Sequence, residues 1–347
     1  MKLLFVLPLM SGTGGIQASL LNLLNEVGPE PHEVTLCVFG NYVSPDTPLP
    51  AWVRVVPGPR VLEYCLADFA SARARYSWHE LPVLAATKVI RRLLGYRRVL
   101  DAALRRFRVP GHFDVAIAYA NDIYAGRDFV GGSNDIVRRC VDADRRVAWI
   151  HNDATRHGLD EERSLRTYAD FDAVVNVSEA CKEIFDRIVP TLAPKSTVVL
   201  NMMDTARIER LARAATPYDD SGSFRIVTVA RLDNRQKRLD RVVDACAELK
   251  AIGVRPFTWH VVGGGPDADM LTRRARDRGV EDVLTFVGHT SNPFPYVAGA
   301  DLFVLTSDYE AYGMVLAEAL TLGVPVVSTR FPAAPEVVDD GENGVLT

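Results

Sequence analysis

Two glutamates eight positions apart, Glu310 and Glu318, have the spacing best suited to binding chemistry in this sequence. The apolar residues 302–306 before them predict a buried strand, and an apolar stretch ending at Gly323 predicts the next helix. At 1.5 Å of rise per residue, the two acids are separated by roughly 12 Å along the axis. Ligands of parallel α/β sheets bind where a strand hands over to a helix. The pair is therefore placed to hold hydroxyl groups at both ends of an elongated ligand.

The residues between the two glutamates add a phosphate-binding feature. Gly313, Met314 and Val315 fall in the predicted first turn, whose amides lack intrahelical acceptors and lie at the positive end of the helix dipole. Glycine at 313 also lets a ligand approach the backbone closely. This combination suits a nucleotide sugar. A first-turn acid that caps the helix, with a second acid facing solvent, explains the same residues, and this stretch alone leaves both interpretations open.

Two cations flank another predicted strand end in the same half of the chain. Arg231 follows the predicted strand 224–230, and Lys237 precedes a predicted helix. If they converge on a diphosphate, they would stabilise the charge on a leaving nucleotide. The alternative is a solvated basic loop, which is the interpretation we favour for Arg235 and Arg238.

The first half of the chain offers three more candidates. Gly14 and Gly15 follow the predicted strand 2–7 and open a helix, as in loops that approach a phosphate, although the spacing matches neither G-x-G-x-x-G nor a P-loop. A tight turn explains these glycines equally well. His151 ends the predicted strand 146–150. A core histidine is the common alternative, but the strand-end position and the polar neighbours favour a site.

Length and composition describe an ordinary globular protein. The 347 residues predict two domains, and 48% hydrophobic with 24% charged residues is a typical balance. The net charge of −4 gives no reason to expect nucleic acid as a partner. Five scattered cysteines without a C-x-x-C pair indicate neither a disulfide framework nor a zinc site, and fit a reducing cytoplasm. No apolar run is long enough to span a membrane.

Strands and helices alternate along the chain, which predicts an α/β fold with parallel sheets. The polar, turn-rich segment around residues 216–223 predicts a boundary. We expect a first domain at 1–203, a linker region at 204–223 and a second domain at 224–347.

Residues 71–108 form a basic stretch with interleaved apolar residues, predicted to be helical from about residue 80. A surface helix with one buried face explains it. The alternative is a surface for anionic lipid head groups. Its basic residues are Arg73, Arg75, Lys88, Arg91, Arg92, Arg97, Arg98, Arg105, Arg106 and Arg108.

Taken in order, these features resemble the retaining family 4 glycosyltransferases (glycosyltransferases group 1). The most specific is the spacing Glu310-(seven residues)-Glu318, followed by the segment 323–328. The other matching features are Gly14-Gly15, His151, Asn201, Arg231 with Lys237, Gly263-Gly264-Gly265-Pro266, Phe286-Val287-Gly288, Glu336 and 341–344. The resemblance implies the GT-B fold, in which two Rossmann-like domains with parallel sheets face each other across a cleft.

The resemblance also implies roles for these residues. Glu310 would hold sugar hydroxyls and Glu318 the ribose. Arg231 and Lys237 would clamp the diphosphate, helped by Gly14, Gly15 and the amides of 313–315. The backbone at Gly288-His289 would meet the base, and His151 would lie beside the transferred sugar.

The implied function is the transfer of a sugar from a nucleotide donor, a UDP-sugar, to a glycan or lipid-linked acceptor in cell-surface polysaccharide synthesis. A non-catalytic nucleotide-sugar-binding subunit and a GT-B-fold epimerase are the alternatives. We expect no metal and no cofactor beyond the donor, because we find no Asp-x-Asp pair at a strand end. A cytoplasmic location, peripheral to the membrane, is expected. Relatives continue with further helices beyond the position of Thr347, so we expect the second domain to be incomplete.

Overall fold

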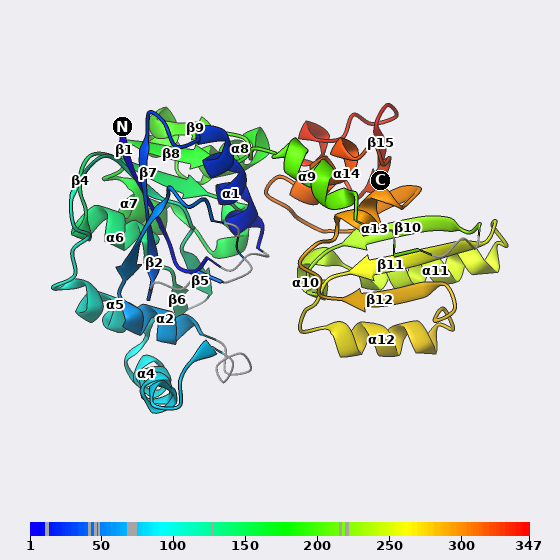
Figure 1. Cartoon of the computed structure of the whole chain (residues 1–347), viewed down its shortest axis with the longest axis horizontal. Helices are drawn as coiled ribbons and strands as arrows, with labels where there is room; N and C mark the ends of the chain where they lie inside the picture. The colour runs from blue at the N-terminus through cyan, green and yellow to red at the C-terminus, as the bar shows by residue number, and fades with distance from the viewer. Residues whose placement is uncertain are drawn as a thin grey trace. The chain divides into compact units, whose positions relative to one another are not determined.

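A computed structural model describes the chain except for residues 11–13, 41–42, 45–46, 48, 68–74, 126–127, 215–216 and 219–221. It divides into two compact units, Met1–Leu200 and Asn201–Thr347. Each unit is built on its own parallel sheet (Figure 1). The expected fold class, α/β with two parallel sheets, is confirmed.

The first unit has a seven-stranded sheet in the order β3-β2-β1-β4-β7-β8-β9, with every neighbouring pair parallel. A separate antiparallel hairpin, β5–β6, follows β4. The strands are β1 (Lys2–Leu7), β2 (Glu33–Phe39), β3 (Arg54–Gly58), β4 (His112–Ala118), β5 (Ile123–Ala125), β6 (Asp128–Val130), β7 (Asp142–Ile150), β8 (Ala173–Asn176) and β9 (Ser196–Val198).

Helices cover both faces of this sheet, which is why its central strands are almost wholly apolar. Leu20, Leu21 and Leu24 of α1 pack on one face, in a core with Phe5 and Leu36. The helices α2, α5, α6 and α8 contribute to the core on the other face. The helices of this unit are α1 (Gly15–Val27), α2 (Arg60–Leu66), α4 (Glu80–Leu94), α5 (Tyr96–Leu104), α6 (Ser133–Cys140), α7 (Glu161–Tyr168) and α8 (Glu179–Ile188).

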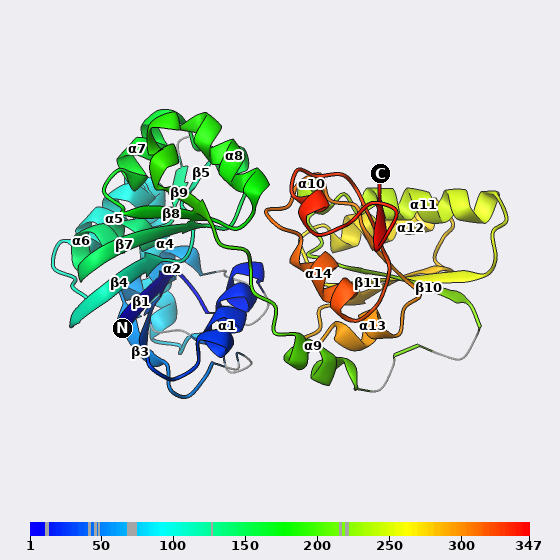
Figure 2. The same ribbon diagram turned by 90° about the horizontal axis from the view of Figure 1, so that it is seen from above.

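The second unit has a six-stranded parallel sheet in the order β12-β11-β10-β13-β14-β15. Figure 2 shows α11 and α12 on one side of it and α9, α13 and α14 on the other. The strands are β10 (Phe224–Val229), β11 (Phe257–Val262), β12 (Leu284–Gly288), β13 (Leu302–Leu305), β14 (Val326–Ser328) and β15 (Gly344–Leu346). The helices are α9 (Thr205–Ala212), α10 (Asn234–Lys237), α11 (Asp240–Ala251), α12 (Ala268–Asp277), α13 (Phe294–Ala298) and α14 (Met314–Thr321).

Two expected segments differ in detail from the structure. The helical stretch expected from residue 80 is two helices, because Gly95 takes a φ of 81° between α4 and α5. The proposed linker at 204–223 contains α9, which belongs to the second unit. Residues 71–74 of the basic stretch lie outside the described residues, as do 215–216 and 219–221 of the linker.

All five cysteines are buried and unpaired. None of the helices in the described part of the chain combines the length and apolarity needed to cross a bilayer.

Candidate functional site

Two loops of the second unit meet at the carboxyl end of its sheet, because β10 and β13 are neighbouring parallel strands. The Asp308 amide donates to the Gln236 carbonyl at 2.9 Å, and Thr306 Oγ1 donates to the Lys237 carbonyl at 2.8 Å. Gln236 Nε2 reaches the Tyr309 carbonyl at 3.1 Å. These bonds fix residues 231–238, called here the Lys237 loop although they include the single turn α10, against the loop that carries Glu310.

Lys237 and Glu310, which the sequence proposes separately, are in direct contact. Lys237 Nζ lies 2.5 Å from Glu310 Oε1, and both side chains are largely buried, with 15% and 12% of their surfaces exposed. Ser307 Oγ donates to the same carboxylate oxygen at 2.6 Å, and Gln236 Nε2 lies 3.4 Å from the other. A cation and a carboxylate are thus held at one place, and these are groups that can bind a diphosphate and hydroxyl groups.

A salt-bridge network lies beside this pair. Asp308 Oδ1 is 2.8 Å from Arg241 Nη2, and Asp308 Oδ2 is 3.2 Å from Arg238 Nη1. Arg238 also pairs with Asp240 at 3.0 Å. The interpretation of Arg238 as a solvated loop residue is therefore wrong, because it joins the two loops. Sequence spacing gave no signal for this, since its partner lies seventy positions away.

Arg231 is placed differently from Lys237. Its side chain is 61% exposed, and its Nη2 pairs with Asp233 at 3.0 Å rather than with Glu310. It lies on the same loop as Lys237, just after β10. A role on the diphosphate requires this side chain to leave Asp233, which an exposed pair permits because such pairs contribute little stability.

The predicted helix is α14, which begins at Met314, slightly later than expected, with Gly313 as its N-cap residue at a φ of 86°. A Cβ at Gly313 would lie 3.0 Å from Phe331 Cζ, so both backbone and packing require glycine here. The first-turn amides of Gly313, Met314 and Val315 precede the first intrahelical bond. They lie directly after the loop that holds Glu310, and first-turn amides of this kind can bind an anion.

Glu318 lies just over one turn into α14 and is half-buried. Burial raises its pKa to about 7, and the nearby charge of Arg207 on α9 acts in the opposite direction. At neutral pH its carboxyl group therefore exchanges readily between acid and carboxylate, both of which bond to hydroxyl groups.

The loops after β11 and β12 lie close to the loop after β10. A Cβ on Gly263 would lie 1.9 Å from the Ala230 carbonyl oxygen, and one on Gly265 would lie 2.5 Å from that of Leu232. The Gly263 amide donates to the Gly288 carbonyl at 2.9 Å. Gly288 has a φ of 87°, and a Cβ on Gly264 would meet His289 at 3.4 Å. Gly288 and His289 are therefore placed at the carboxyl edge of the sheet, beside the loop of Arg231 and Lys237.

In the first unit, His151 follows β7 and is buried. Its amide donates to Asn121 Oδ1 at 2.9 Å, and its ring centroid lies 4.5 Å from that of Tyr119. Burial lowers its pKa to about 3, so the imidazole is neutral at physiological pH. Nε2 has no partner among the described residues. A neutral ring of this kind can exchange a hydrogen bond with a sugar hydroxyl but carries no charge.

Gly14 and Gly15 begin α1, with Gly14 as the N-cap residue. No described atom lies within 4 Å of a Cβ built on Gly15, so packing does not require glycine there and the backbone is open to a ligand. Tyr119 connects this helix to His151, because its hydroxyl lies 2.9 Å from Ser19 Oγ of α1. Gly12, the first glycine of this loop, lies outside the described residues.

Sequence reasoning missed three residues that come after β4, two of which, Tyr119 and Asn121, contact His151. Tyr119, Asn121 and Asp122 all follow β4, the strand between β1 and β7. Asp122 is buried, which raises its pKa to about 7, and it accepts from the Gly132 amide at 3.0 Å. The available signal was the Asn-Asp pair directly after the predicted strand 115–120, the same kind of signal that singled out His151.

Comparisons with known proteins add a family and a fold. The family described as "Glycosyl transferases group 1" matches residues 217–347. A lipopolysaccharide core biosynthesis glycosyltransferase, LpsE of Rhizobium meliloti, is 32% identical over 151 residues, which is 43% of this chain and 42% of that protein. N-acetyl-alpha-D-glucosaminyl L-malate synthase of Bacillus anthracis is 26% identical over 239 residues, 68% of this chain and 60% of that protein. The chain thus spans about two fifths to three fifths of these relatives.

Solved structures resemble the whole chain. Anabaena HepE in complex with UDP and glucose aligns with all of this chain and 85% of that one, with a TM-score of 0.62 and 19% identity. The lipopolysaccharide outer core galactosyltransferase WaaB aligns with all of this chain and 86% of that one, with a TM-score of 0.59 and 17% identity. At this identity the likeness shows the GT-B type of fold. The part of the chain that matches glycosyl transferases group 1, residues 217–347, lies in the second unit.

Proposed function

We propose that this chain is a retaining glycosyltransferase that transfers a sugar from a UDP-sugar to a glycan or lipid-linked acceptor in cell-surface polysaccharide synthesis. The observation that carries the proposal is the contact between Lys237 and Glu310 at 2.5 Å, on two loops joined at the carboxyl ends of β10 and β13. The family match over residues 217–347 supports it. The names of LpsE and of HepE with UDP and glucose support the acceptor class and the donor base.

In this proposal each group at the sheet edge holds one part of the donor. Lys237 and Arg231, with the α14 amides from Gly313 to Val315, bind the diphosphate. Glu310 binds hydroxyls of the sugar and Glu318 those of the ribose. The backbone at Gly288 and His289 meets the base, and His151 donates to or accepts from the sugar being transferred.

The reaction proceeds by attack on the face that the nucleotide leaves. The bond from the anomeric carbon to the phosphate oxygen breaks, and the acceptor hydroxyl bonds to that carbon. Its proton passes to the departing phosphate oxygen. Cations and first-turn amides lower the barrier by stabilising the charge that develops on the diphosphate. Glu310 acts by positioning the sugar, because its carboxylate is already held by Lys237 and Ser307.

Donor binding is tested by thermal shift and calorimetry with a panel of UDP- and GDP-sugars, since a ligand specific to the folded state raises its stability. We expect one donor to bind, and Lys237→Ala to weaken its binding at least tenfold through the loss of a charge-assisted contact. Lys250→Ala is the matched control. Lys250 also pairs with an acid of the second unit, at 2.6 Å from Asp282, but belongs to α11 and not to the loop. Equal loss in both variants would contradict the assignment.

Transfer itself is tested by following release of the nucleoside diphosphate with and without glycan acceptors. We expect release to accelerate in the presence of acceptor and to fall at least a hundredfold in Glu310→Gln. Donor binding without any transfer would support a non-catalytic subunit instead. An isomerised donor sugar formed without acceptor would indicate an epimerase.

We also propose that α4 places the protein on a membrane surface. Leu93 is 76% exposed, although it is a large apolar residue. Several apolar side chains of α4, and one that lies two positions before it, are also exposed, and contiguous exposed apolar surface marks an interaction site. They are Trp78, Val83, Val89, Ile90, Leu93 and Leu94.

Seven of the basic residues of this stretch divide into two groups, while Lys88 and Arg108 donate to the Ala67 and Phe107 carbonyls. Arg75, Arg91 and Arg97 bond to Glu63, to the Cys65 carbonyl and to Asp135, so their charges serve the fold. Arg92, Arg98, Arg105 and Arg106 are exposed. At about 1 kcal/mol for each cation near an anionic surface, these four assist binding, while the apolar face of α4 supplies the rest.

The membrane proposal is tested by flotation with vesicles that contain phosphatidylglycerol. We expect the protein to float with the vesicles, only partly released by salt, and Leu93→Asp to abolish flotation. Ile252→Asp is the control, because Ile252 is 71% exposed but belongs to the second unit. No flotation of the unaltered protein would refute the proposal.

A further inference from the structure

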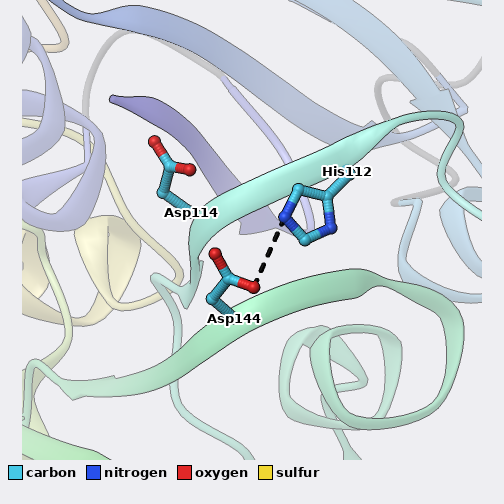
Figure 3. Close-up of side chains that lie close together, drawn as sticks. All are labelled: His112, Asp114 and Asp144. Carbon is cyan, nitrogen blue, oxygen red and sulfur yellow. Dashed lines mark ion pairs between the residues drawn. The ribbon is translucent and has the colours of Figure 1, made fainter.

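The amino-terminal edge of the first sheet carries an imidazole and three carboxylates on two paired strands. His112 and Asp114 are the first and third residues of β4, and Asp142 and Asp144 are the first and third residues of β7. In the parallel pairing His112 lies opposite Asp142. Residues two apart in a strand point to the same side, so all four side chains can gather on one side of the strand pair. Figure 3 shows His112, Asp114 and Asp144 grouped in this way.

The imidazole lies between two of the carboxylates. His112 Nδ1 is 3.2 Å from Asp142 Oδ2, and His112 Nε2 is 3.4 Å from Asp144 Oδ1. One ligand atom each from His112, Asp114 and Asp144 lies within 4.8 Å of the others. Asp114 is fixed by the Lys2 amide, which donates to its Oδ2 at 2.7 Å.

We propose that His112 Nε2, with one carboxylate oxygen each from Asp114 and Asp144, binds a divalent transition-metal ion of the Zn²⁺ type. Asp142 is not a ligand in this site. It accepts the Nδ1 proton of His112 and so holds the ring with Nε2 facing the ion.

The orientation of the ring is the first argument for a metal. Metal-binding histidines usually donate their other ring N–H to a carboxylate, which fixes the tautomer and the ring direction. Asp142 is placed to do this for His112. The separation of Nε2 from Asp144 Oδ1 also fits, because ligands at 2.0–2.1 Å from a tetrahedral zinc ion lie about 3.4 Å apart. An imidazole among carboxylates favours Zn²⁺ or its neighbours over Mg²⁺ and Ca²⁺, which prefer oxygen ligands alone.

Charge is the second argument. Within the described ranges, no lysine or arginine side chain forms an ion pair with Asp114, Asp142 or Asp144, and His112 is the partner of the latter two. Three carboxylates on two adjacent strands repel one another, since like charges placed directly across strands are destabilising. A doubly protonated His112 offsets part of this repulsion. A divalent ion offsets more, and takes the place of the proton on Nε2, which is released to solvent.

This site goes beyond the proposed transfer reaction. It lies at the amino-terminal edge of the sheet, whereas His151 follows the carboxyl end of β7. A metal there joins β4 to β7 and stabilises the first unit. The ligands remain open to solvent, with 52% of the His112 and 64% of the Asp144 side chain exposed, so water or a small anion completes the coordination.

The test uses the full chain, freed of metal with a chelator and titrated with Zn²⁺ by calorimetry and with Co²⁺ by visible absorption. We expect one ion per chain, a Co²⁺ spectrum typical of nitrogen and oxygen ligands, and a rise in melting temperature. Asp144→Asn and His112→Ala should each lower the affinity for Zn²⁺ at least tenfold. Asp142→Asn should lower the affinity for Zn²⁺ by about tenfold, which is typical when the hydrogen-bond partner of a metal-binding histidine is lost.

Asp170→Asn is the matched control, because Asp170 is an exposed acid of the same unit that pairs with Arg138. It should leave the affinity unchanged. Circular dichroism verifies folding, and Asp144→Asn alone decides the question if His112→Ala does not fold. Unchanged Zn²⁺ affinity in folded Asp144→Asn, or no stoichiometric binding to the unaltered chain, would overturn the proposal and leave an imidazolium bridging two aspartates.

Discussion

At the scale of residues, the pairing of Lys237 with Glu310 has a direct consequence for the proposed donor. The cation assigned to the diphosphate is held by the acid assigned to the sugar, with Nζ and Oε1 2.5 Å apart. Donor binding then exchanges one partner for another instead of uncovering a free charge. The two largely buried groups keep their positions in the free protein, and such preorganised groups need little rearrangement when the reaction takes place.

Gly313 is predicted to be essential for two separable reasons. Gly313→Ala places a side chain at a φ of 86° and against Phe331, so we expect a loss of stability of about 2 kcal/mol and loss of donor binding. Gly323→Ala is the control, because Gly323 ends the same helix at a φ of 73° with no described atom within 4 Å of its Cβ. This variant should lose about 1 kcal/mol of stability and bind the donor with unchanged affinity. Denaturant unfolding and donor calorimetry measure the two effects.

If Gly323→Ala weakens donor binding as much as Gly313→Ala does, the effect comes from the stability of α14 and not from the turn that we assign to the diphosphate.

Glu318 predicts a pH dependence of stability. Its pKa is raised from the usual 4.5 to about 7 in the folded chain, so between these values the folded state binds a proton that the unfolded state lacks. Stability should therefore fall as pH rises from about 5 to 8, by at most about 3 kcal/mol from this group. Glu318→Gln should remove that part of the slope. Denaturant unfolding of both proteins at pH 5, 6, 7 and 8 measures it, and parallel curves would contradict the raised pKa.

At the scale of elements, long apolar segments were predictable and polar ones were not. The first strand, residues 2–7, has the predicted bounds, and the apolar helix expected after Glu310 is present as α14. The helix α6 was missed because its sequence, SNDIVRRC, is mostly polar, yet its Ile136 and Val137 are fully buried. The break at Gly95 was also missed, since glycine inside an apolar pattern does not by itself end a helix.

Asp308 tests whether the joined loops matter for donor binding. Asp308→Ala removes the partner of both Arg238 and Arg241, so we expect the loop of Lys237 to loosen and the donor affinity to fall by about three- to tenfold. Asp244→Ala is matched to it. Asp244 also pairs with two arginines, Arg274 and Arg278, and both aspartates are 35% exposed. The control should keep its affinity in calorimetry, and a similar decrease in both would contradict a local effect of the loops.

At the scale of the whole molecule, alternating strands and helices were enough to predict two parallel sheets, because each buried strand is an apolar run bounded by turn residues. The sheet orders were not predictable in this way. They depend on crossovers that bring β10 beside β13 and β1 beside β4. Paired strands such as β1 and β4 are far apart in the sequence, because β1 ends at Leu7 and β4 begins at His112. For the same reason spacing proposed Lys237 and Glu310 singly, whereas Tyr119 and Asp308 became visible only once the strands were paired.

The buried cysteines give the whole chain a property of practical use. Burial raises the thiol pKa of Cys37 and of Cys246 to about 12, and each of the five thiols is enclosed in the interior of its unit. Because thiolates are the reactive form, the folded surface should be inert towards maleimides and similar reagents. A single cysteine introduced at an exposed position would then be the one reactive thiol for attaching a fluorophore or spin label. The five native cysteines would not have to be replaced first.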